Sequence, residues 1–75
     1  MKHKHIIELY LKAYCDAIED DTYIFSPHMS GSNSFAIYFE DGVFKGVKTS
    51  EDLDAAPTIL SNLKEVQDYV RANYV

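Results

Sequence analysis

Few side chains in this sequence have the chemistry of a nucleophile. Ser30 and Ser32 stand close to His28, and acyl transfer uses this pairing of hydroxyl and imidazole. No Gly-x-Ser-x-Gly turn surrounds either serine, and a loop of this composition holds catalytic geometry poorly. Cys15 lies in an apolar helical pattern, which favours a small core residue over an activated thiolate. We therefore expect no enzymatic activity and no catalytic residue.

The histidines and glycines do not form a metal site or a phosphate site. His3 and His5 would share one side only in an extended segment, and zinc requires three or four ligands in most sites. Gly31 stands without the glycine-rich pattern and lysine of a phosphate-binding loop. We expect no bound metal and no cofactor.

The first predicted helix carries its charges in the unfavourable order, with Lys2 and Lys4 at its start. An acidic cluster lies at its end: Asp16, Glu19, Asp20 and Asp21. The helix macrodipole favours the opposite order by ~0.3–1 kcal/mol per charge. The cluster also lacks the spacing of a calcium loop. Two interpretations stay open, a solvated turn or an acidic surface presented to a basic partner.

The six tyrosines exceed what so small a core can bury. They are Tyr10, Tyr14, Tyr23, Tyr38, Tyr69 and Tyr74. Tyrosine is enriched at protein interfaces because its ring is rigid and amphipathic. The set predicts at least one contact surface that contains tyrosine.

Length and charge restrict the class of protein. Seventy-five residues predict a single domain over residues 1–75. The formal charge of −5 disfavours direct binding to nucleic acid, which requires clustered Lys and Arg. No apolar stretch approaches the ~20 residues that span a bilayer, so we expect no membrane contact. The single cysteine excludes an intramolecular disulfide and, with the absence of a signal-peptide pattern, favours the cytoplasm.

Three short apolar segments rich in aromatic and β-branched residues predict an antiparallel meander: Thr22 to Phe25, Phe35 to Phe39 and Val43 to Lys48. Asp41-Gly42 separates the last two and favours a two-residue type I′ turn. That turn pairs Phe39 with Phe44, Ile37 with Gly46 and Tyr38 with Lys45. A bulge at Gly42 would shift the register by one residue. We prefer the first register because it gathers the phenylalanines on one side, and Gly46 then marks a close approach of a helix or of another backbone.

Helices are predicted on both sides of the meander. His5 to Ile18 has apolar residues at helical spacing, and Ile6, Leu9 and Ala13 widen the apolar arc. Such a helix either sits deep against the sheet or contacts a second surface.

Leu63 to Tyr74 forms the second predicted helix, and Asn62 with Glu65 has the spacing of a capping box. Between the meander and this helix, Glu51 to Ala55 predicts a helical turn and Pro57 to Leu60 a short edge strand. Ser26 to Ser34 is expected to be a loop with fast amide exchange.

The predicted fold is therefore α+β, with both helices on one face of a three-stranded sheet. The predicted core is Ile7, Leu11, Tyr14, Phe35, Ile37, Phe39, Leu63, Val66 and Val70. The opposite face carries the predicted interaction residues Tyr38, Val43, Lys45 and Val47, bordered by Glu40 and Asp41; the acidic cluster is the second choice.

These features favour a non-enzymatic protein-interaction module, an adaptor or inhibitor of a protein partner, for which a basic surface is the best match. A homodimer through the same face is a further possibility. The alternative functions are an acidic mimic of DNA and a small ligand-binding or enzymatic domain. A DNA mimic requires carboxylates spread over one face, whereas a ligand-binding domain requires a pocket with converging polar groups.

Overall fold

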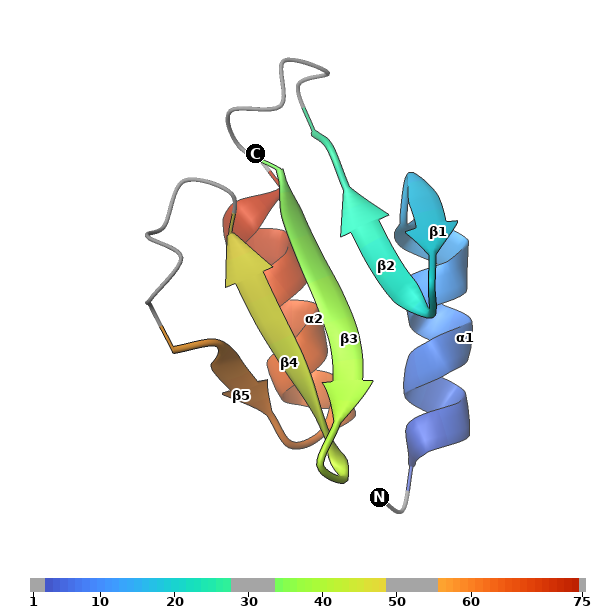
Figure 1. The fold of residues 1–75 in the computed structure, drawn as a ribbon, viewed down its shortest axis with the longest axis vertical. Helices are drawn as coiled ribbons and strands as arrows, with labels where there is room; N and C mark the ends of the chain where they lie inside the picture. The colour runs from blue at the N-terminus through green and yellow to red at the C-terminus, as the bar shows by residue number, and fades with distance from the viewer. Residues whose placement is uncertain (1–2, 28–33, 49–55, 75) are drawn as a thin grey trace.

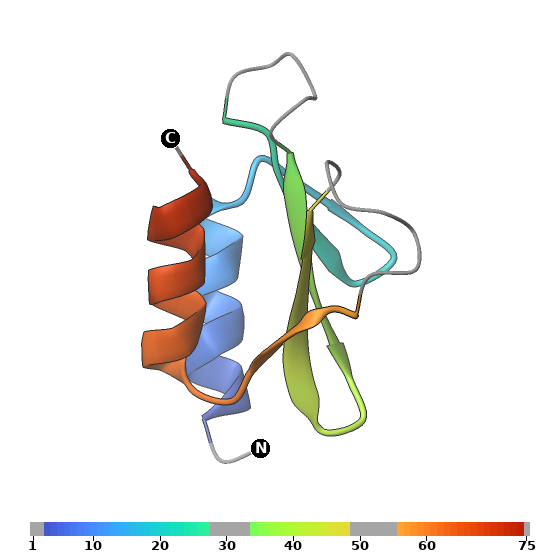
Figure 2. The same cartoon turned by 90° about the vertical axis from the view of Figure 1, so that its left-hand side faces the viewer.

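The computed structural model describes residues 3–27, 34–48 and 56–74, which form an antiparallel sheet and two helices (Figure 1). The sheet has five strands in chain order: β1 (Ala17–Glu19), β2 (Thr22–Phe25), β3 (Phe35–Glu40), β4 (Val43–Lys48) and β5 (Thr58–Leu60). Helices α1 (Lys4–Tyr14) and α2 (Leu63–Asn73) lie side by side over one face (Figure 2). The α+β class and this placement of the helices confirm the prediction, but the sheet is larger than the predicted meander.

The predicted end of the first helix is wrong. Helix α1 ends at Tyr14, and Cys15 is extended, with φ −70° and ψ 157°. The chain then enters β1, which pairs with β2 through a tight turn at Asp20-Asp21. Both aspartates have positive φ, 48° and 62°, a conformation that Asp tolerates better than most residues. The residues predicted to end the helix form a hairpin instead. Their backbone hydrogen bonds to β2 stabilise these three residues more than a continuation of the helix would.

The predicted register of the second hairpin is confirmed. Phe39 pairs with Phe44 and Ile37 with Gly46 across β3 and β4. Asp41 and Gly42 both have positive φ, 54° and 81°, as a type I′ turn requires. The Asp-Gly pair therefore places the phenylalanine side chains of both strands on the helix-covered face and Tyr38 on the opposite one.

The chain that follows β4 is described only from residue 56. There, the predicted edge strand is confirmed as β5, which pairs with β4. The predicted helical turn over Glu51 to Ala55 and residues 28–33 of the predicted loop lie outside the described residues, and the loop's expected fast exchange stays a prediction.

The core lies between the helices and the sheet. Its fully or nearly fully buried side chains are Ile7, Leu11, Tyr23, Phe25, Phe35, Ile37, Phe44, Leu60, Val66, Tyr69 and Val70. Phe39 and Leu63 are half-buried and pack against it. Tyr14 was predicted to be buried but is 61% exposed. Its ring lies beside α2, against that of Tyr10 with 4.7 Å between ring centroids, instead of over the sheet.

The start of α2 is capped as the sequence predicts. The side-chain oxygen of Asn62 accepts a hydrogen bond from the Glu65 backbone N–H at 2.9 Å. In return, the Glu65 carboxylate accepts the N–H of Ser61 at 2.7 Å, one residue earlier than in the usual capping box. The N–H of Glu65, which the helix leaves without an internal partner, is thereby satisfied, and so is the N–H of Ser61 just before the cap.

We expect Asn62→Ala to lower the free energy of unfolding by about 1 kcal/mol, because it removes the acceptor for the Glu65 N–H. Urea denaturation followed by circular dichroism measures this change. Ser61→Ala is the matched control, since only the backbone of Ser61 takes part in the cap. Equal losses for the two variants would contradict the role of the Asn62 side chain.

Candidate functional site

The face of the sheet turned away from the helices, here called the open face, carries an apolar row across four strands. Ala17 pairs with Ile24, Ile24 with Ala36, and Ala36 with Val47. Paired residues of antiparallel strands point to the same face, so these side chains are neighbours. Ile24, Ala36 and Val47 are half-buried even though neither helix covers them. The row is a continuous apolar strip on this surface.

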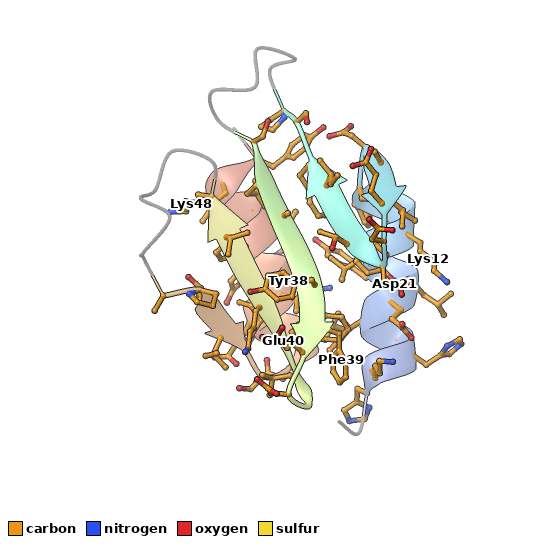
Figure 3. The ribbon with its side chains drawn as sticks, viewed as in Figure 1. Lys12, Asp21, Tyr38, Phe39, Glu40 and Lys48 are labelled. Carbon is orange, nitrogen blue, oxygen red and sulfur yellow. The ribbon has the colours of Figure 1, made fainter. Side chains whose placement is uncertain are left out.

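A second row crosses the same face two residues further along β3. Tyr38 pairs with Lys45, and Lys45 with Ile59, which is 50% exposed (Figure 3). The Lys45 ammonium lies 3.0 Å from a Glu40 carboxylate oxygen and 3.2 Å from one of Asp41. These hydrogen bonds raise the pKa of Lys45. The lysine therefore stays charged and is held against the acidic turn.

The predicted interaction residues Tyr38, Val43, Lys45 and Val47 thus meet on one face. The structure also brings two acidic turns to one end of it. β1 and β3 run in the same direction in this meander, so the turns that follow them lie at the same end. We call this end the acidic rim; it consists of Glu19, Asp20, Asp21, Glu40 and Asp41. The sequence predicted the two groups as alternative surfaces, whereas the fold makes them parts of one.

Asp16 is separated from the other members of the predicted acidic cluster. Its carboxylate accepts the Ser26 N–H at 2.6 Å, and its own N–H donates to the Ile24 carbonyl at 2.8 Å. The Tyr74 hydroxyl lies 3.4 Å from both of its carboxylate oxygens. Desolvation and the Asp16 charge together raise the pKa of Tyr74. Asp16 therefore joins the α1–β1 connection to β2 and to the end of α2.

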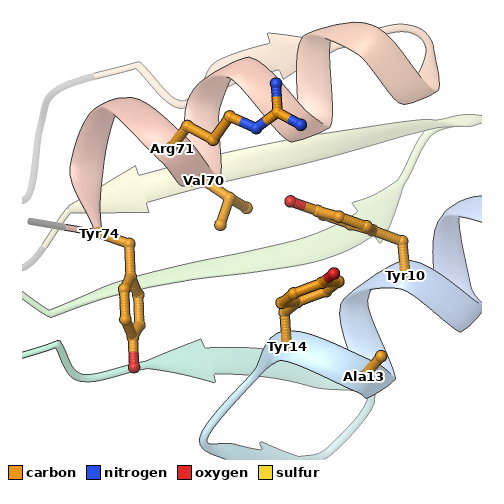
Figure 4. Close-up of a pocket in the computed structure, with 6 residues that line it drawn as sticks. All are labelled: Tyr10, Ala13, Tyr14, Val70, Arg71 and Tyr74. Atoms are coloured by element: carbon orange, nitrogen blue, oxygen red, sulfur yellow. The ribbon is translucent and has the colours of Figure 1, made fainter.

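A cleft between the two helices, on the other layer of the molecule, was not predicted from the sequence. It has a volume of about 450 Å³ and is lined by Tyr10, Ala13, Tyr14, Val70, Arg71 and Tyr74 (Figure 4). Beside it, Ile6 and Leu9 on α1 are 50% and 54% exposed. The wide apolar arc of α1 was the sequence signal that could have indicated this second surface, since Ile6 and Leu9 do not pack against the sheet.

The residues considered for metal binding or nucleophilic chemistry do not converge. His3 and His5 are exposed at the start of α1, and His28, Ser30 and Ser32 lie outside the described residues. Burial raises the pKa of the Cys15 thiol, which reduces its thiolate fraction. In the described parts of the chain, no three His, Cys, Asp or Glu residues come close enough to hold a metal ion.

Comparison with known proteins gives no match to a family model, a curated protein or a solved structure. Neither described helix is long and apolar enough to cross a membrane. The open face and the cleft are therefore the features that bear on function.

Proposed function

We propose that this protein is a non-enzymatic interaction module whose open face binds a partner protein with an apolar strip flanked by Lys or Arg. The observation that carries this proposal is the apolar row, from Ala17 to Val47, on a face that ends in the acidic rim. Protein interfaces combine an apolar centre with a polar border, and this face has both.

The apolar side chains supply the affinity in this proposal. Tyr38 is a rigid anchor of the kind that dominates binding energy, and Val47 and Ile59 provide apolar area around it. The edge strands β1 and β5 have three residues each, so they offer little backbone for strand addition. Contact through the face is therefore favoured over contact through an edge.

Charge selects between a basic partner and a second copy of the chain. Lys45 pairs with Glu40 and Asp41, which leaves the rim acidic overall. A second copy carries the same net charge of −5, so that long-range repulsion opposes its approach. A partner with Lys or Arg beside its apolar strip is complementary to both parts of the face.

The alternative of a DNA mimic has less support from the geometry. A mimic needs carboxylates at phosphate-like intervals along one face. On the open face the described carboxylates gather at one end, next to apolar rows. This arrangement favours a surface that binds a protein. Salt dependence separates the two functions, because contacts made by charge alone weaken in moderate salt.

The double variant Tyr38→Ala, Val47→Asp is expected to abolish partner capture while the fold is kept, since both side chains lie on the open face. The measurement is affinity capture of the partner from a cell lysate at low salt and at 0.5 M salt, with wild type and variants side by side. At 0.5 M salt, charge interactions are screened beyond about 4 Å. We expect the wild type to retain a partner at both salt concentrations and the double variant to lose it. Ile6→Asp, a similar change on the exposed side of α1, is the control that should retain it.

Sedimentation of the purified protein tests the choice of partner. The proposal expects a wild-type monomer. A dimer that the double variant dissociates would assign the open face to a second copy instead. Capture that survives the double variant would place the binding surface elsewhere, and capture lost by the wild type at 0.5 M salt would favour the DNA mimic.

A further inference from the structure

The cleft between α1 and α2 has aromatic walls on two sides. The Tyr10 and Tyr14 rings form one wall, tilted by 39° to each other with centroids 4.7 Å apart. Tyr74 forms the other wall, and Val70 lies between them (Figure 4). The Tyr74 ring is fixed by edge-on contacts to Phe25 and Phe35, at centroid distances of 6.2 and 6.4 Å. The second wall is therefore anchored in the core, and the cleft has the aromatic lining that flat apolar groups prefer.

A cation lies at one side of this cleft. The side chains of Arg71 and Tyr10 extend toward each other from α2 and α1, with the guanidinium and the hydroxyl at their ends (Figure 4). The Arg71 charge lowers the pKa of Tyr10, although burial of the ring raises it by more. Among the described residues, the ion pairs involve other side chains, and Arg71 takes part in none of them.

Within the described ranges Arg71 has no carboxylate partner, which is unexpected in so acidic a chain. Twelve acidic residues face seven basic ones, yet Asp68, which precedes Arg71 by one helical turn on α2, is paired with Lys64 at 3.3 Å. The cleft therefore combines aromatic walls with a guanidinium and a phenol that have capacity to donate hydrogen bonds. Guanidinium binds carboxylates in a bidentate manner, and such charge-assisted hydrogen bonds are stronger than neutral ones.

We propose that this cleft is a binding site for a small aromatic carboxylate. The ring of the ligand lies between Tyr74 and the Tyr10–Tyr14 pair, over Val70. Its carboxylate accepts hydrogen bonds from the Arg71 guanidinium and the Tyr10 hydroxyl. A volume of about 450 Å³ accommodates one or two fused rings and falls within the range of small-molecule sites. The site is on the helix layer and is independent of the open face.

The test titrates the ¹⁵N-labelled full chain with 2-naphthoate and with its neutral amide, 2-naphthamide, and follows backbone amide shifts. The two probes share one ring system, so the difference in their affinities isolates the charge. We expect 2-naphthoate to shift amides in the C-terminal halves of α1 and α2 and to bind about tenfold more tightly than the amide. Arg71→Gln should remove this difference, and Tyr14→Ala should weaken both probes.

Lys12→Gln is the matched control. It removes the same charge from an exposed position on α1 that does not line the cleft, so the preference for 2-naphthoate should persist. All three altered residues are exposed, and the amide spectrum of each variant verifies its fold before titration. Equal affinity for the two probes would overturn the proposal. Equal losses in Arg71→Gln and Lys12→Gln would do so as well, because they would indicate a general effect of charge.

Discussion

Replacement of Ile37 by alanine is expected to leave much of the protein unfolded at 25 °C. Ile37 is 0% exposed and lies on the central strand β3, where it pairs with Tyr23 on one side and Gly46 on the other. Truncation of a buried isoleucine costs ~2–5 kcal/mol, because contacts are lost and a cavity remains. A domain of this size has a free energy of unfolding of only ~3–5 kcal/mol. Urea denaturation followed by circular dichroism measures the loss.

Tyr38→Ala is the matched control for this prediction, because Tyr38 follows Ile37 in the same strand but lies on the open face. Its unfolding transition should shift much less. Phe39→Ala should fall between the two, since Phe39 is half-buried and meets the Phe44 ring at 4.9 Å. A cooperative and nearly unshifted transition for Ile37→Ala would contradict the assignment of the core.

The parts of the fold that the sequence predicts correctly are those determined by local chemistry. Asp41-Gly42 determines a turn type, the turn type determines the register, and the register decides which aromatic side chains face the helices. The cap at Asn62 is also local, because it involves residues three positions apart. In both cases the interacting groups are close in the chain, and a single sequence contains the information.

The parts that it does not predict depend on distant partners. Ala17–Glu19 is too short to show a period, and its strand conformation comes from pairing with β2. The exposure of Tyr14 follows from the way α1 lies beside α2, which places its ring at the cleft. The acidic rim depends on the β1–β2 hairpin, which was not predicted. This hairpin brings Asp20 and Asp21 to the same end of the sheet as Glu40 and Asp41. The cleft depends on how α1 and α2 pack, and no local pattern contains that information.

Gly46 lies in β4 directly below a ring of α2, as the sequence predicted for a glycine within a strand. A Cβ atom at this position would lie 2.6 Å from Cζ and 2.7 Å from Cε1 of Tyr69. The Tyr69 ring cannot move aside easily, because it is 8% exposed and meets Phe35 edge-on at 5.6 Å. We therefore expect Gly46→Ala to lower the free energy of unfolding by about 1–3 kcal/mol, as overpacking of a core does.

A double-mutant cycle with Tyr69→Leu, measured by urea denaturation, identifies the cause. Leucine removes the ring atoms that the new methyl group would meet, so Gly46→Ala should cost little in that background and even stabilise the strand, where glycine is a poor residue. Gly42→Ala provides the contrast, because its Cβ meets nothing within 4 Å while its φ is +81°. Its loss comes from backbone strain and should be the same with Tyr69 or Leu at position 69. If Gly46→Ala were equally destabilising in both backgrounds, the close approach of α2 to β4 would not be the reason for the glycine.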